Sequence, residues 1–290
     1  NPDNTKAFAD FIAAARKLKA SKLQLPKGVY HFSDFGKRAI LFDNMADFEF
    51  DGSGSLLVFF SKDSKPVFFE INNCKRAVFK NFSLDWNFAI QPLSTRVSVL
   101  SGDADSGVLL FETPDYQKHP DKTLKIDRIV PLDNLTLKPS RKGESSHCRL
   151  KHVVWLSDNR FQAVADMHGK DWRLPAKGDN YVIPHCYWAG YSLYTGKSEH
   201  ISFESVNVYA SRGFGFYVAS TDYVRFSGCK VTVNPDALPA RMMSTNSDAL
   251  DFLNSRKGNF IIENCEFSRS GDDFINLNSS SYCGLLYTDV

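Results

Sequence analysis

The segments ISFESVNV (residues 201–208), VRFSGCKV (residues 224–231) and FIIENCEF (residues 260–267) decide the fold of this chain. Their apolar residues occupy the same positions, and the segments begin 23 and then 36 residues apart, at 201, 224 and 260. Short strands that recur with a period of roughly 20 to 50 residues are typical of chains in which each coil buries its apolar face on its neighbours. We therefore expect a right-handed parallel β-helix. The longer second interval is explained by a loop around residues 234–241.

The N-terminal third continues the same pattern in a weaker form. Residues 79–84 (FKNFSL) resemble residues 262–267 (IENCEF), and short alternating runs at 48–50, 56–60 and 67–71 precede them. Such runs, bounded by Gly, Asn, Asp or Ser, predict strands. Before them, apolar residues recur at helical spacing from Ala7 to Leu18, after Asn4 as a candidate N-cap. The sequence therefore predicts one N-terminal helix that caps the first coils.

The middle of the chain lacks the repeat. From about residue 88 to residue 184 the sequence shows hairpin-like alternation, which predicts a small antiparallel β-domain inserted into an otherwise all-β coiled fold. We expect three parts: residues 1–87 as the cap and first coils, 88–184 as the inserted domain, and 185–290 as the coils with the candidate site. Because a last coil without a cap would leave an open sheet edge, we expect the polypeptide to continue beyond residue 290.

Composition narrows the classes of partner. Lys and Arg number 35 against 33 Asp and Glu, a formal charge of +2 with no basic cluster, so we expect no nucleic-acid partner. No stretch approaches the roughly 18 consecutive apolar residues of a membrane span. The six cysteines show no CxxC spacing, which argues against zinc, and buried thiols are expected. They are Cys74, Cys148, Cys186, Cys229, Cys265 and Cys283. The repeat makes Cys229 and Cys265 inward neighbours, at a distance that allows a disulfide without requiring one.

Three aspartates border the last strands. In the register of the repeat, Asp248 falls within one residue of Asp272 on the neighbouring coil, roughly 4.8 Å away, and Asp273 follows directly. Each alone is typical of a turn residue. Together they would repel, and at least one pKa would rise, which suits an enzyme that needs one carboxylic acid and one carboxylate. Glycoside hydrolysis uses such a pair, and a separation of roughly 6.5 to 9.5 Å leaves room for the water of an inverting enzyme.

The segments MSTNSDA (residues 243–249), GNFIIENCEF (258–267) and GDDFIN (271–276) resemble the β-helix α-1,3-galactosidases of glycoside hydrolase family 110. Residues 3–8, 25–30 and 198–203 resemble the same family, as does the layout with an inserted β-barrel-like domain. The resemblance implies an inverting exo-glycosidase, without metal or cofactor, in which Asp248, Asp272 and Asp273 are catalytic. We expect such an enzyme to be secreted or periplasmic.

Two departures from that family concern the sugar more than the reaction. Asp251 stands where the family tends to carry His, and Asn278-Ser279 stands where it carries a His-Gly pair. A more distant resemblance is to polygalacturonases, whose Asn-Thr-Asp and Gly-Asp-Asp signatures are similar to residues 246–248 and 271–273. By that analogy Asp272 is the acid, and Asp248 and Asp273 are the bases.

The candidate substrate-binding residues are Arg241, Trp188, Tyr217, Asp251 and Asn276. Aromatic rings stack on sugar faces but also fill cores, so most aromatic residues of the 187–217 region, Tyr187 included, are expected in the core. Arg241 fits either substrate binding or an ion pair with an aspartate. The main hypothesis is an exo-acting α-galactoside hydrolase whose substrate is an oligosaccharide or polysaccharide. The protein partner expected is a further C-terminal segment or a second copy of the chain. The alternatives are a polygalacturonase-like hydrolase of acidic polysaccharide and a non-catalytic glycan-binding β-helix.

Overall fold

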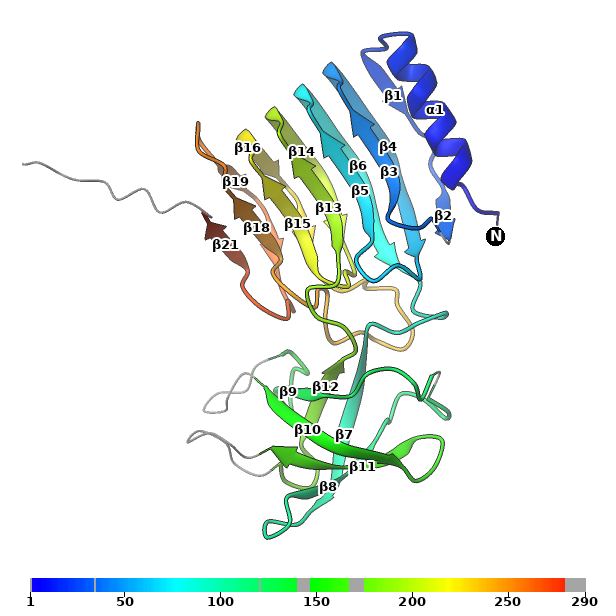
Figure 1. The fold of residues 1–290 in the computed structure, drawn as a ribbon, viewed down its shortest axis with the longest axis vertical. Coiled ribbons are helices and arrows are strands. Elements are labelled where there is room, and N and C mark those ends of the chain that lie inside the picture. The colour runs from blue at the N-terminus through cyan, green and yellow to red at the C-terminus, as the bar shows by residue number, and fades with distance from the viewer. Residues whose placement is uncertain (1, 34, 120, 140–146, 167–174, 280–290) are drawn as a thin grey trace, which may run out of the picture.

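The computed structural model describes residues 2–33, 35–119, 121–139, 147–166 and 175–279, which form one helix, two parallel sheets and one closed barrel (Figure 1). The helix is α1 (Thr5–Lys17). The first parallel sheet contains β1 (Lys22–Gln24), β2 (Val29–Ser33), β4 (Ala46–Phe60), β6 (Lys75–Trp86), β14 (Glu199–Val208), β16 (Asp222–Ser227), β17 (Lys230–Val231), β19 (Ile261–Glu263) and β20 (Glu266–Phe267). The second contains β3 (Arg38–Asp43), β5 (Val67–Asn72), β13 (Tyr191–Gly196), β15 (Phe214–Ala219), β18 (Leu250–Leu253) and β21 (Ile275–Asn278). The barrel contains β7 (Ser94–Gly102), β8 (Val108–Glu112), β9 (Arg128–Pro131), β10 (Cys148–Trp155), β11 (Arg160–Asp166) and β12 (Asn180–Pro184).

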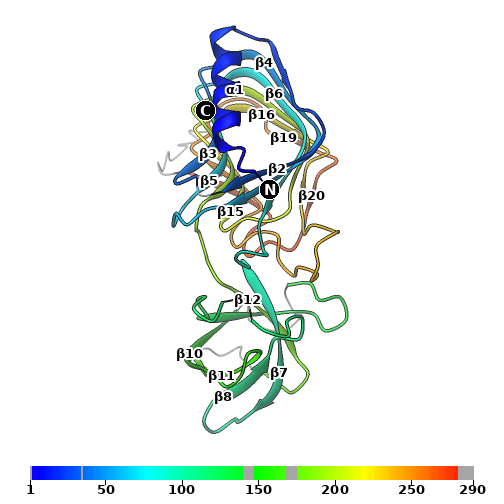
Figure 2. The same cartoon turned by 90° about the vertical axis from the view of Figure 1, so that its right-hand side faces the viewer.

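The chain passes alternately through the two parallel sheets, so that each turn pairs with the turn before it. Figure 2 shows these turns lying one behind another. Their register is the one that the repeat predicts, since Ile201 pairs with Val224 and Arg225 pairs with Ile261. The weaker upstream copy also fits, because Phe79 pairs with Phe203. The expectation of a mostly β chain with parallel sheets is therefore confirmed.

Stacked apolar side chains hold the turns together. The rings of Phe203 and Phe226 are 5.0 Å apart and those of Phe79 and Phe203 are 6.0 Å apart, and all three side chains are fully buried. Burying a Phe side chain contributes roughly 1.5 to 3 kcal/mol. Repetition of this contact from coil to coil explains why the apolar positions recur in the sequence.

The same bend recurs two residues after each of these Phe residues and after Ile262, which pairs with Phe226 on the next coil. Asn81, Ser205, Gly228 and Asn264 all have positive φ values, of 58°, 53°, 64° and 54°. Asn and Gly adopt this left-handed conformation more readily than most residues. Asn81 and Asn264 thus have the same structural role on different coils.

The helix α1 covers the first turn of the stack (Figure 1). Its buried residues include Phe8 and Ile12, and the Phe8 ring lies 4.9 Å from that of Phe32 on β2. The expected N-cap is corrected in detail. Asn4 makes no side-chain capping bond; its amide donates to the His31 carbonyl, and Asp3 Oδ1 accepts from the Thr5 N–H instead.

The chain enters the barrel after β6 and leaves it before β13. Its strands pair antiparallel in the closed order β10-β11-β8-β7-β12-β9, around a core of their own in which the Phe111 and Phe161 rings stack 5.0 Å apart. Figure 1 shows the barrel beside the end of the coils that is formed by the loops before β13, β15, β18 and β21. In the part of the chain that is described, no helix is long and apolar enough to cross a membrane.

The cysteines of the described ranges are free thiols: Cys74, Cys148, Cys186, Cys229 and Cys265. Cys229 and Cys265 lie just before the paired residues Lys230 and Glu266, as neighbours on successive coils, but they form no disulfide. The remaining cysteine, Cys283, lies outside the described residues.

Candidate active site

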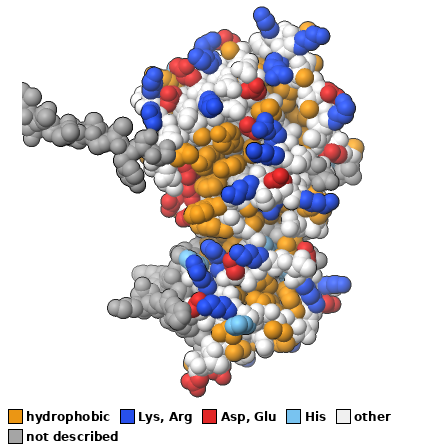
Figure 3. All heavy atoms as spheres, in the orientation of Figure 1, with side chains coloured by type: hydrophobic (Ala, Val, Ile, Leu, Met, Phe, Trp, Pro, Cys, Tyr) orange, Lys and Arg blue, Asp and Glu red, His pale blue; other side chains and the backbone are white. Residues whose placement is uncertain are grey.

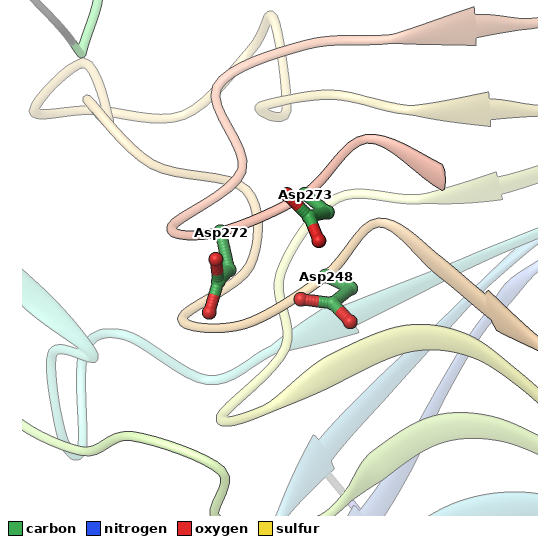
Figure 4. A group of neighbouring side chains, drawn as sticks. All are labelled: Asp248, Asp272 and Asp273. Atoms are coloured by element: carbon green, nitrogen blue, oxygen red, sulfur yellow. The ribbon is translucent and has the colours of Figure 1, made fainter. Parts of the chain in front are cut away.

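The three aspartates lie on two stacked loops. Asp248 ends the loop between β17 and β18, and Asp272 and Asp273 end the loop between β20 and β21. The Ala249 N–H donates to the Asp273 carbonyl at 2.9 Å, and Leu250 pairs with Ile275 in the strands that follow. Stacking of the two coils therefore places Asp248 beside the Asp272-Asp273 pair (Figure 4).

The carboxylates converge. One oxygen of each of Asp248, Asp272 and Asp273 lies within 4.8 Å of the others. Asp248 is buried, with 3% of its surface exposed, while Asp272 and Asp273 are exposed. The convergence expected from the repeat is confirmed. The separation of these oxygens is shorter than the roughly 6.5 to 9.5 Å anticipated for an inverting pair.

A fourth carboxyl, that of Asp251, lies next to Asp248, and the two share the Asn276 amide as a hydrogen-bond donor. Asn276 Nδ2 donates to Asp248 Oδ2 at 3.0 Å and lies 3.5 Å from Asp251 Oδ2, so one amide serves both side chains. Asp251 is 4% exposed, and its Oδ1 has no hydrogen-bond partner among the described residues. Burial, and then the hydrogen bond with Asp248, raises the pKa of Asp251 to about 7. A proton on Asp251 gives the buried pair its missing donor.

A proton on Asp251 affects the charge of the neighbouring Asp248 carboxyl. The pKa of Asp248 is raised above its ordinary value: burial raises it most, the hydrogen bonds from Asn276 and Asp251 lower it, and the charges of Asp272 and Asp273 raise it further. A protonated Asp251 and the Asn276 amide are the two hydrogen-bond donors that favour the charged form of Asp248. The pair therefore suits a buried carboxylate that acts as a base.

Tyr187, which was expected in the core, lies at the carboxylate cluster instead. Its hydroxyl donates to Asp272 Oδ2, and the Arg128 guanidinium lies 4.8 Å from the centre of its ring. Burial, and then the bond to Asp272, raises the pKa of Tyr187 well above its usual range, so the phenol keeps its proton. The sequence feature that could have indicated this role is the position of Tyr187 in the segment that connects the barrel to the coils, between β12 and β13.

A hollow of about 470 Å³ lies between the barrel and the coils, next to Asp272 and Asp273. Its lining residues are Arg128, Val130, Pro139, His147, Pro184, Tyr187, Met243, Asn246, Arg269, Ser270, Gly271, Asp272, Asp273 and Phe274. Pockets of roughly 300 to 1,000 Å³ are typical of small-ligand sites. Nothing in the sequence indicated Arg128 or His147, because these two residues lie more than 100 positions before the aspartates.

Four of the five predicted substrate-binding residues lie near the cluster. Trp188 is 56% exposed, and its backbone N–H donates at 3.0 Å to the hydroxyl of Ser247, the residue before Asp248. Tyr217 on β15 pairs with Asp251 on β18, and Asp251 pairs with Asn276 on β21.

Arg241 is the exception. It forms a nearly buried ion pair with Asp85, with the two side chains 11% and 4% exposed, and its guanidinium lies 4.0 Å from the centre of the Phe88 ring. It is not among the residues that line the hollow. The structure thus places Arg241 away from the cluster, where it binds the loop before β18 to the end of β6.

The three clustered carboxylates are also the group whose oxygens are close enough together to hold a metal ion, within the part of the chain that is described. Hard cations such as Ca²⁺ prefer such oxygen ligands. The same spacing serves acid–base chemistry without a metal, so the geometry by itself assigns no cation.

Converging carboxylates at the ends of parallel strands, beside a hollow of sugar-sized volume, are the arrangement expected of a glycoside hydrolase. No family model matches the chain. The chain is similar to α-1,3-galactosidase B of Bacteroides fragilis, at 23% identity over 310 aligned positions that cover 97% of this chain and 50% of that protein. It is also similar to α-1,3-galactosidase B of Parabacteroides distasonis, at 24% identity over 97% of this chain and 49% of that protein.

The resemblance to α-1,3-galactosidases that the motifs indicate is thus confirmed, and the chain spans about half the length of the curated relatives it matches. Among solved structures, a crystal structure of a candidate glycosyl hydrolase from Parabacteroides merdae matches at 8% identity, with 92% of each chain covered and a TM-score of 0.39.

Proposed function

We propose that this chain carries the catalytic site of a glycoside hydrolase that releases a terminal sugar from an α-galactoside with inversion. The observation that carries the proposal is the convergence of Asp248, Asp272 and Asp273 from successive coils to within 4.8 Å. The similarity to proteins named α-1,3-galactosidase supports the choice of sugar and linkage.

The proposed roles follow from the surroundings of each carboxyl. Asp272 faces the hollow and acts as the acid that protonates the leaving oxygen. Asp248 and Asp273 hold and deprotonate the attacking water, and the protonated Asp251 keeps Asp248 ionised. Tyr187 donates to one oxygen of Asp272, which leaves the other oxygen to carry the transferred proton.

The stereochemical course rests on the resemblance and not on the measured separation. For a two-carboxylate site, a spacing of roughly 5 to 5.5 Å favours retention and roughly 6.5 to 9.5 Å favours inversion. The oxygens here lie within 4.8 Å, but three carboxylates are present, and two of them can bind one water between them. The anomer of the product is the direct test.

We further propose the finer features of the fold and setting. The coiled region is a right-handed parallel β-helix, and residues 88–184 form its inserted domain between residues 1–87 and 185–290. An enzyme that acts on external glycans is secreted or periplasmic, and its partner is an oligosaccharide or polysaccharide.

A hydrolase of acidic polysaccharide is the second candidate. Arg128 and Arg269 line the hollow beside Asp272 and Asp273, and cations at this place would bind a carboxylate substituent of the sugar. The third candidate, a β-helix that binds glycans without cleaving them, predicts the same cluster without turnover.

The experiment is a screen of the full chain against nitrophenyl α- and β-glycosides and oligogalacturonides. Asp248→Asn and Asp272→Asn should each lose nearly all turnover, by roughly the 100- to 10,000-fold that acid–base catalysis supplies. Asp105→Asn, in the exposed turn between β7 and β8, is the matched control and should keep full activity. NMR of the first product identifies the anomer. Unchanged turnover in both cluster variants would refute the proposal, and an unchanged glycan affinity with no turnover in any form would favour the binding protein.

A further inference from the structure

The outer face of the second parallel sheet carries a cluster of partly exposed aromatic rings: Tyr191, Tyr194, Phe214 and Tyr217, called here the tyrosine face. The centre of the Tyr191 ring lies 4.6 Å from that of Tyr217 and 5.6 Å from that of Tyr194, and the Tyr194 and Tyr217 rings are nearly parallel, 5.9 Å apart. Figure 3 shows hydrophobic side chains gathered on the face of the coils where β13 and β15 lie in the same orientation in Figure 1.

The hydroxyl groups of this face are available to a ligand. Among the described residues, the hydroxyls of Tyr191, Tyr194 and Tyr217 make no hydrogen bond. Burial is the main cause that raises the pKa of each phenol, so each hydroxyl keeps its proton and remains a donor. Flat apolar rings with protonated hydroxyl tips match the two kinds of surface on a sugar, its C–H face and its hydroxyls.

The face is continuous with the carboxylate site. Glu70, Tyr194, Tyr217, Asp251 and Asn276 pair in turn across β5, β13, β15, β18 and β21. With about 4.8 Å between neighbouring strands, Tyr194 lies roughly 10 Å along the sheet from Asp251. An occupant that extends across Tyr217 therefore reaches the site where the glycosidic bond is cleaved.

The backbone below Tyr194 is shaped for a flat ring. A Cβ atom added at Gly196 would lie 2.8 Å from Tyr194 Cε1 and 3.0 Å from its hydroxyl oxygen. Any side chain at Gly196 would thus lift the ring off the strand. On the neighbouring strand β5, the rim of the tyrosine face is polar, because Glu70 forms an ion pair with Arg38 at 3.0 Å.

We propose that the tyrosine face is a sugar-binding subsite, which holds at least one further unit of the glycan whose scissile bond lies at the carboxylates. This inference rests on the proposed function and deepens it, since it makes the substrate an oligosaccharide bound across several coils and not a single terminal sugar. Continuity with Asp251 and Asn276, and the polar rim at Glu70, are what favour a glycan over a protein partner on this face.

The test measures binding apart from turnover. Affinities are measured by titration calorimetry in an Asp272→Asn background, with galactose, with Galα1-3Gal and with the trisaccharide Galα1-3Galβ1-4GlcNAc as probes. Tyr194→Ala removes the ring farthest from the carboxylates, and Tyr194→Phe removes only the hydroxyl. Tyr223→Ala is the matched control, because Tyr223 is a 40% exposed ring on β16 in the other sheet.

We expect Tyr194→Ala to weaken trisaccharide binding about 3- to 10-fold, the loss expected for one aromatic contact, and to change galactose binding less than about 2-fold. Tyr194→Phe should lie between Tyr194→Ala and the parent, and Tyr223→Ala should match the parent. Equal trisaccharide affinity in Tyr194→Ala and its parent overturns the inference, as does a trisaccharide that binds no more tightly than galactose.

The outcomes separate this inference from the proposed function. Ring-dependent trisaccharide binding in a chain that hydrolyses no glycoside supports the subsite and refutes the hydrolase. Hydrolysis that is lost in Asp248→Asn but indifferent to Tyr194→Ala supports the hydrolase and refutes the subsite.

Discussion

Replacement of Asp251 by asparagine isolates the buried carboxyl pair. The substitution keeps the size and shape of the side chain. The new amide supplies at every pH the donor to Asp248 that the wild-type side chain supplies only while it is protonated. Asn276, which donates to both carboxyls, keeps an oxygen acceptor at position 251.

The magnitude follows from the pKa of Asp251. Its value of about 7 in the folded protein exceeds the ordinary 3.8 by roughly 3 units, which corresponds to at most about 4 kcal/mol. Because the folded pKa of Asp251 is raised, the native state keeps a proton between about pH 4 and pH 7 that the unfolded chain has already released. The free energy of unfolding therefore decreases as pH rises through this window and levels off above it.

The assay compares urea unfolding of the wild type and Asp251→Asn at about pH 4.5 and about pH 8. We expect the stability of the variant relative to wild type to increase by roughly 2 to 4 kcal/mol from the lower to the higher pH. Wild-type activity should also decline above about pH 7, when Asp248 loses its donor, whereas the activity of the variant should extend to higher pH.

The control is Asp105→Asn, whose stability relative to wild type should be the same at both pH values, since that side chain lies in an exposed turn. A stability difference for Asp251→Asn that is equally independent of pH would show that Asp251 is ionised throughout. The shared-proton account of Asp248 would then be wrong.

Three further predictions follow from the contacts of the site and its support. Tyr187→Phe removes the hydroxyl bond to Asp272 and should lower kcat by roughly 10-fold, the loss expected for about 1.5 kcal/mol of a hydrogen bond to a charged group, with a shifted pH–rate profile as the readout. Arg241→Ala leaves Asp85 buried and unpaired and should destabilise the chain by about 3 to 5 kcal/mol in urea unfolding, whereas the double variant with Asp85→Asn should recover part of that loss. Dialysis against EDTA should leave activity unchanged, and a loss that Ca²⁺ restores would instead assign a cation to the carboxylate cluster.

Much of the coiled region could be predicted because its determinants are local and repeated. The apolar positions at 201, 224 and 260 mark equivalent places on successive turns, and the positive-φ residues that follow them mark the bends. The alternation of the insertion predicted only antiparallel strands, since alternation specifies strands but not their partners, and the expectation of a barrel came from the family resemblance. Closure of β7 to β12 into a barrel depends on pairings such as β9 with β10 and β12, which no short-range pattern encodes.

The candidate site was likewise predictable only in part from the sequence. The period of the repeat sufficed to bring Asp248 to Asp272 and Asp273, because each pair of neighbouring coils has a fixed offset. It did not suffice for Arg241, whose buried partner Asp85 lies 156 residues earlier in the chain. It also left open the role of Tyr187, whose bond to Asp272 spans 85 residues.

The repeat alone specified the β coils, their register and the meeting of three carboxylates, because stacked coils convert a linear period into a spatial one. The folded molecule was needed to show which carboxyl shares its proton, which barrel residues line the hollow and where the tyrosine face lies relative to the cluster. Those properties depend on burial, and burial is created by segments that meet in space without any fixed spacing along the chain.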